Sequence, residues 1–76
     1  KVCVMNNLNV AKIQLNGSPY EINTETNLNQ LLNKLKIQKT KVAIEVNGAI
    51  VEKNKYPKVI LNKGDEVEIV HFIGGG

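Results

Sequence analysis

The sequence is poor in the residues that build disulfides, metal centres and nucleic-acid interfaces. Its 76 residues include one cysteine, one histidine, three aromatic residues and no arginine. One cysteine excludes an intrachain disulfide and a cluster held by four cysteines, and His71 lacks the partners of a tetrahedral zinc site. Arginine is the usual reader of phosphate and guanine, and the ten lysines are spread along the chain. We therefore expect no metal and no nucleic-acid partner.

Long apolar runs and the length for a large core are also missing. No run approaches the ~18 residues of a transmembrane helix, and no secretory signal is visible, so a cytoplasmic protein without membrane contact is expected. A chain of this length forms one domain at most and buries only about 60 % of its unfolded surface. It has one histidine and no defensible pair of carboxylates for acid–base chemistry. We therefore do not expect an enzyme. We interpret Cys3 as an incidental thiol and His71 as a structural or half-exposed histidine.

Two kinds of local pattern predict the first half of the fold. Polar and apolar residues alternate over 12–15 and 20–23, on either side of Asn16-Gly17, which predicts a hairpin with a type I′ turn. Asn27 with Gln30 three residues later is typical of a capping box at a helix start. The leucines that follow lie on one helical stripe and predict a helix ending near residues 36–38. These leucines are Leu28, Leu31, Leu32 and Leu35.

The second half of the chain predicts further strands separated by turns. Asn47-Gly48 marks a tight turn, and Gly64 occupies a turn position that needs an unusual φ. The predicted elements are a strand at 42–46, a short continuation at 49–51, an irregular or single-turn connection at 52–58, a short strand at 59–61 and a strand at 66–72. A hairpin, one helix and further strands in so short a chain imply an α+β fold with one mixed sheet packed on one main helix.

The last strand has an unusual outer face and an unusual end. Val67 and Ile69 are expected to point to the core, which places Val70 and Phe72 on the opposite face with Glu66 and Glu68. Exposed apolar side chains beside a slim glycine tail predict a surface that docks on a partner. The proposed docking residues are Val70, Phe72 and Ile73, and the proposed tail residues are Gly74, Gly75 and Gly76.

The order and spacing of several segments resemble the ThiS family, the sulfur carriers of thiamine biosynthesis. The resemblance covers residues 12–76. The segments that carry it are the run 46–51, the Gly64-Asp65 turn, the Leu31-Leu32 pair in the helix, and the last strand through Phe72-Ile73 into Gly75-Gly76. This resemblance implies a β-grasp, ubiquitin-like domain at 12–73 and a flexible tail at 74–76. Residues 1–11 are expected to form an N-terminal extension that is partly a product of cloning or processing.

The resemblance also implies a chemical role for the end of the chain. The carboxylate of Gly76 would be adenylated by a ThiF-like enzyme that uses ATP, and sulfur would then replace one oxygen to give a thiocarboxylate. The sulfur would pass to a ThiG-like thiazole synthase. In this picture the carrier holds no bound cofactor and supplies no catalytic side chain, Gly74 and Gly75 carry the terminus into the partner, and Val70 and Phe72 match the docking positions.

Two alternatives share part of this interpretation. The small subunit of molybdopterin synthase has the same fold, diglycine end and activation chemistry, although such proteins tend to be longer between helix and tail. A ubiquitin-like interaction module whose tail is never activated belongs to a different class. The chemistry at Gly76 separates the module from the carriers, and the sulfur acceptor separates the carriers from one another.

Overall fold

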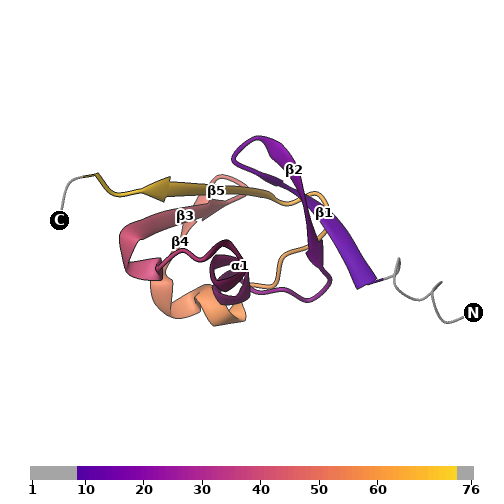
Figure 1. The fold of residues 1–76 in the computed structure, drawn as a ribbon, viewed down its shortest axis with the longest axis horizontal. Coiled ribbons are helices and arrows are strands. Elements are labelled where there is room, and N and C mark those ends of the chain that lie inside the picture. The colour runs from indigo at the N-terminus through magenta and orange to yellow at the C-terminus, as the bar shows by residue number, and fades with distance from the viewer. Residues whose placement is uncertain (1–8, 74–76) are drawn as a thin grey trace, which may run out of the picture.

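Five strands form one mixed sheet in the computed structural model, which describes residues 9–73 (Figure 1). One α-helix, α1, and two 3-10 helices at Lys39–Lys41 and Lys53–Lys58 complete the regular structure of this region. The strands are β1 (Val10–Leu15), β2 (Ser18–Asn23), β3 (Val42–Val46), β4 (Ala49–Val51) and β5 (Glu66–His71), and α1 spans Leu28–Leu35.

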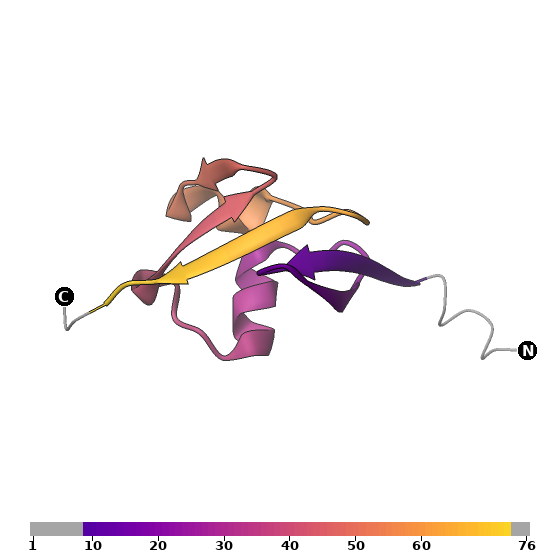
Figure 2. The same ribbon diagram turned by 90° about the horizontal axis from the view of Figure 1, so that it is seen from above.

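The last strand in the sequence lies in the middle of the sheet. The strand order is β2-β1-β5-β3-β4, with β5 parallel to β1 and antiparallel to β3. Figure 2 shows β5 crossing the sheet with α1 against one face. The start of β1 and the end of β5 lie at opposite ends of the molecule (Figure 1). The predicted β-grasp arrangement of a mixed sheet on one helix is therefore confirmed.

Both predicted Asn-Gly turns adopt the backbone that a type I′ hairpin requires. Asn16 and Gly17 have φ angles of 50° and 86°, and Asn47 and Gly48 have φ angles of 52° and 86°. Glycine tolerates this left-handed region because it has no Cβ, and asparagine is among the few other residues that enter it readily. Gly64 also has a φ of 86°, as the sequence predicted for that turn.

The predicted capping box starts α1. The side chain of Asn27 accepts a hydrogen bond from the Gln30 amide at 2.8 Å, and the Gln30 side chain accepts one from the Asn27 amide at 2.9 Å. At the other end Lys36 takes a left-handed conformation with a φ of 61° and closes the helix. Within residues 9–73, no helix combines the length and the apolar character needed to cross a membrane.

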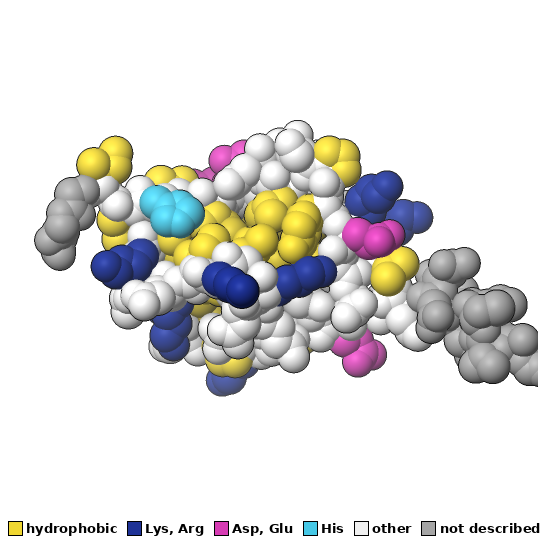
Figure 3. Space-filling model, in the orientation of Figure 1, with side chains coloured by type: hydrophobic (Ala, Val, Ile, Leu, Met, Phe, Trp, Pro, Cys, Tyr) yellow, Lys and Arg dark blue, Asp and Glu magenta, His cyan; other side chains and the backbone are white. Residues whose placement is uncertain are grey.

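A single apolar core fills the layer between the sheet and α1. In Figure 3 apolar side chains gather in this layer, and lysines border it. Three leucines of the predicted helical stripe are buried here, and the fourth, Leu35, packs against the edge. The buried residues are Ile13, Ile22, Leu28, Leu31, Leu32, Val42, Ile44, Tyr56, Leu61, Val67 and Ile69.

The structure differs from the sequence predictions at two places. The predicted strand at 59–61 is wrong, because Ile60 forms only an isolated bridge with Asn27 and the Leu61 amide donates to the Thr26 carbonyl. This segment meets the loop before α1 rather than another strand, so no ladder develops. The sheet also begins at Val10, two residues before the predicted domain boundary.

The buried stripe of α1 makes a direct stability prediction. Leu32 is 2 % exposed, so Leu32→Ala leaves a cavity and is expected to lower the free energy of unfolding by about 2–5 kcal/mol. Asn33→Ala changes an exposed neighbour on the same helix and serves as the control. Urea denaturation of both variants measures the difference, and equal stabilities would contradict the assigned helix face.

Candidate functional site

The two faces of β5 differ sharply in exposure. Val67 and Ile69 are 1 % and 7 % exposed, whereas Val70 and Phe72 are 55 % and 56 % exposed. The sequence prediction of which side chains face the core is therefore confirmed. Ile73 follows β5 and is 97 % exposed. We call Val70, Phe72 and Ile73 the terminal apolar patch, because exposed apolar side chains this close together are typical of an interaction surface.

The backbone fixes the point at which the chain leaves the sheet. His71 pairs with Val42, and the Phe72 amide donates to the Lys41 carbonyl at 2.9 Å. The terminal apolar patch thus straddles the end of the ladder, with Phe72 tethered and Ile73 beyond it. The predicted tail residues Gly74, Gly75 and Gly76 lie outside the described residues, and so does Cys3.

Two turn asparagines hold β5 in register. The Asn16 side-chain oxygen accepts a hydrogen bond from the Ile69 amide at 2.7 Å, and the Asn47 oxygen accepts one from the Glu66 amide at 2.9 Å. The Asn47 amide group also donates to the Asp65 carboxylate at 3.1 Å. The two hairpin turns therefore form hydrogen bonds with β5 from both sides. These hydrogen bonds support the register in which Val67 and Ile69 are buried and Val70 and Phe72 face outward.

Lys53 contacts the ring of Phe72 in the terminal apolar patch. Its ammonium donates to the Val42 carbonyl at 2.7 Å and lies 5.4 Å from the centre of the Phe72 ring. The same nitrogen is 6.0 Å from the centre of the Tyr56 ring. Lys53 is partly buried, although the sequence suggested only a polar connection over residues 52–58.

Tyr56 is the buried aromatic neighbour of Lys53. Its side chain is 0 % exposed, and within the described residues its hydroxyl has no partner in hydrogen-bonding geometry. Burial raises the pKa of this hydroxyl because it disfavours the phenolate, and the nearby backbone of Ile44 lowers it by less.

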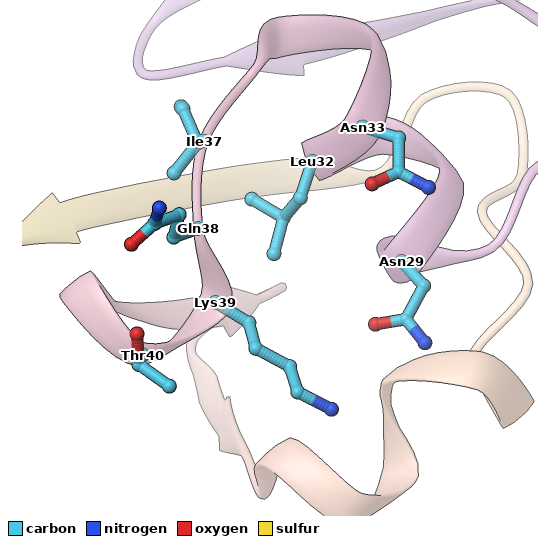
Figure 4. Close-up of a pocket in the computed structure, with 7 residues that line it drawn as sticks. All are labelled: Asn29, Leu32, Asn33, Ile37, Gln38, Lys39 and Thr40. Atoms are coloured by element: carbon cyan, nitrogen blue, oxygen red, sulfur yellow. The ribbon is translucent and has the colours of Figure 1, made fainter.

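A shallow cleft opens between α1 and residues 37–40 (Figure 4). Its volume is about 460 Å³, and the lining residues are Asn29, Leu32, Asn33, Ile37, Gln38, Lys39 and Thr40. In Figure 4, Asn29 and Asn33 project from the helix, and Lys39 extends from the facing segment. These side chains offer hydrogen bonds and one ammonium group but neither a carboxylate nor an imidazole.

The acidic residues and His71 are further candidates for a shared site. No group of three or more histidine, cysteine, aspartate or glutamate side chains between residues 9 and 73 is placed to hold a metal ion. His71, which shares its parity with Ile69, is exposed at the end of the sheet and contributes nothing to the core. The candidate site is therefore a surface.

The position of Lys53 beside β3 could have been predicted from the register of the β3–β4 hairpin. Counting back from the Asn47-Gly48 turn pairs Ile44 with Val51, and the same register places Lys53 opposite Val42. A residue opposite Val42 can reach the Val42 carbonyl, which lies beyond the end of β4. The roles of Asn16 and Asn47 beyond their turns have no comparable signal, because their partners are far away in the sequence.

Comparison with known proteins gives consistent results. A family model described as the ThiS family matches residues 13–76. A thiazole synthase from Magnetococcus marinus is 46 % identical over 65 residues, which are 86 % of this chain but only 20 % of that protein. The chain thus spans about a fifth of that relative.

Two other matches extend over nearly the whole of the matched protein. The sulfur carrier protein ThiS of Bacillus subtilis is 37 % identical over 65 residues, covering 84 % of this chain and 98 % of the relative. The crystal structure of the thiamine biosynthesis protein ThiS from Geobacter metallireducens superimposes with a TM-score of 0.75 at 32 % identity. That superposition covers 86 % of this chain and 99 % of the other.

Tyr56→Phe tests the unpartnered hydroxyl and its raised pKa. At neutral pH the variant is expected to be at least as stable as the parent, because it removes a buried polar group that has no partner. Above about pH 10 the unfolded tyrosine ionises before the folded one does, so the parent loses stability as the pH rises. The variant lacks this loss, because phenylalanine has no hydroxyl to ionise.

Urea denaturation between about pH 7 and pH 11 measures both effects. A variant that is less stable than the parent by more than about 1 kcal/mol at neutral pH would contradict the assignment, because that loss would mean that the hydroxyl has a partner.

Proposed function

This chain belongs to the ThiS family of sulfur carrier proteins, and we propose that it carries sulfur as a thiocarboxylate on Gly76 for thiazole formation in thiamine biosynthesis. The observation that carries the proposal is the continuity of the site. The core face of β5 anchors the strand, its outer face presents the terminal apolar patch, and the next residues are the glycines that the family model includes.

The chemistry explains why such a carrier needs a partner enzyme. A carboxylate is a poor electrophile, because its charge is delocalised and an oxide ion is a poor leaving group. We propose that a ThiF-like enzyme joins a Gly76 carboxylate oxygen to the α-phosphorus of ATP and releases pyrophosphate. Hydrosulfide, or a donor that delivers sulfur at the same oxidation level, then attacks the acyl carbon and expels AMP, which leaves a thiocarboxylate with sulfur in place of one oxygen.

In these steps the carrier brings the Gly76 carboxylate into the active site of its partner. Glycine residues have no Cβ, so the tail is the slimmest segment that a chain can insert into a narrow channel. Three residues span at most about 11 Å when extended. The reacting centre of each partner therefore has to lie within that distance of the point where Ile73 docks.

The proposed partners are a ThiF-like adenylating enzyme and a ThiG-like thiazole synthase. The similarity of this chain to a fifth of a protein named thiazole synthase supports the second partner and favours thiazole over molybdopterin as the acceptor. Each partner would use the terminal apolar patch in turn, because both need the glycine tail in their active site.

Intact-protein mass spectrometry tests the carrier chemistry. The chain ending at Gly76 is incubated with ATP, a sulfur source and the adenylating enzyme of the same organism. The expected result is a mass increase equal to the replacement of one oxygen by sulfur. Deletion of Gly75 and Gly76 is expected to abolish the increase without changing the thermal unfolding midpoint.

The controls separate the alternatives. Absence of the mass increase with an enzyme shown to be active on another carrier would contradict the proposal and favour an interaction module that is never activated. The thiocarboxylated protein is then offered to a thiazole synthase and to the large subunit of molybdopterin synthase. Loss of sulfur only to the latter would reassign the acceptor.

Phe72→Asp tests the docking role of the terminal apolar patch. A charge at the centre of an apolar contact is expected to weaken binding to the adenylating enzyme at least tenfold, with little change in stability, because Phe72 is 56 % exposed. Ile60→Asp is the matched control, since Ile60 is 44 % exposed and forms its bridge with Asn27, before α1 and outside the sheet. Isothermal titration calorimetry compares the variants, and equal weakening by both would contradict a specific patch.

A further inference from the structure

Lys53 takes the place of a missing strand partner at the edge of β3. The β3–β4 ladder ends at the pair Ile44–Val51, and its continuation would set Lys53 opposite Val42. The backbone turns into the 3-10 helix at Lys53 instead, so it forms no further ladder with β3. The Lys53 ammonium donates to the Val42 carbonyl at 2.7 Å, which satisfies the acceptor that the ladder leaves open.

The same ammonium reaches the ring of Phe72. The distance of 5.4 Å from the nitrogen to the ring centre lies within the range of a cation–π contact. The Val42 carbonyl holds the nitrogen in place, and Val42 pairs with His71, the residue before Phe72. The ring, the ammonium and the end of the β3–β5 ladder therefore form one connected unit.

Phe72 needs such support because of its position. It is 56 % exposed, and its backbone is tied to the sheet by one hydrogen bond to Lys41. An exposed phenylalanine at a strand end samples several rotamers unless a neighbour restricts it, and restricting it beforehand lowers the entropy lost on binding. Among the cation–π contacts of the described residues, one involves Phe72, and Lys53 supplies its cation.

We propose that Lys53 is a positioning residue of the docking surface, which holds the Phe72 ring in its binding orientation where the chain leaves the sheet. The inference rests on the proposed function, because it concerns recognition of this carrier by the adenylating enzyme. Lys53 acts through the ring and takes no part in the reaction at Gly76.

Steady-state kinetics of the adenylating enzyme, with the carrier as the varied substrate, test the proposal. Lys53→Met is expected to raise the KM for the carrier about twofold to fivefold and to leave kcat unchanged, as loss of an exposed cation–π contact predicts. Lys53→Arg keeps both the donor and the cation and is expected to restore the parent KM. Lys55→Met, which changes an exposed lysine on the same 3-10 helix, is the control.

A double-mutant cycle separates positioning from simple support of β3. Phe72→Leu keeps an apolar side chain but removes the ring, so adding Lys53→Met to it is expected to cause no further rise in KM. A further rise of the same size in the Phe72→Leu background would overturn the proposal, because Lys53 would then act without the ring. A Lys53→Met variant with a lower unfolding midpoint but a parental KM would also overturn it.

Proton NMR keeps this inference separate from the proposed function. Protons stacked over an aromatic ring are shifted upfield, so the Lys53 side-chain methylene signals are expected to move downfield in Phe72→Leu. This measurement needs no enzyme. Lys53 signals that stay unchanged in Phe72→Leu would overturn the contact, even if the chain is thiocarboxylated. Lys53 signals that shift in a chain that is never thiocarboxylated would count against the proposed function alone.

Discussion

The register of β5 is the constraint on which the rest of this structure depends. Side chains alternate between the two faces of a strand, so a slip by one residue would exchange every inward and outward position. It would expose Val67 and Ile69 and bury Val70 and Phe72. The side chain of Asn16 binds one amide of β5 and that of Asn47 binds another. These two hydrogen bonds would be lost in a slipped register, as would the burial of Val67 and Ile69, and both come from residues of the hairpin turns.

β5 pairs with its two neighbouring strands over different lengths, and this difference leaves its C-terminal end paired on one side. Against β1 the parallel ladder covers only Glu66 and Val67, whereas against β3 it runs to His71. The end of β5 after Ile69 therefore projects past the first hairpin while it remains paired with β3. The terminal apolar patch lies on this projecting end, directly before the glycines. A thin core can support such a surface, although it has no room for a deep catalytic cleft.

The proposed function follows from this division between the two faces. The buried face holds the core of the domain, and the proposed function assigns recognition to the exposed end. Lys53 connects the two, because one ammonium completes the edge of β3 and also contacts the ring of Phe72. In the proposed function, the chemistry at Gly76 is carried out by the partner enzymes.

The sequence by itself determined the parts of this protein that depend on neighbours in the chain. Both Asn-Gly turns, the Asn27 capping box, the leucine stripe and the alternation of β5 were predicted correctly, because each follows from local backbone preferences or from side-chain periodicity. The outward position of Val70 and Phe72 followed from the same alternation. The patch was therefore predictable before its surroundings were known.

Only the tertiary structure decided the contacts between distant segments. The segment 59–61 had the composition of a strand but met a loop, so it formed a single bridge. The hydrogen bond between Asn16 and Ile69 spans 53 residues, and nothing near either residue in the sequence indicates the other. The contact between Lys53 and Phe72 likewise required β3 to lie between them. Such contacts depend on the order of the strands in space, which local sequence patterns do not specify.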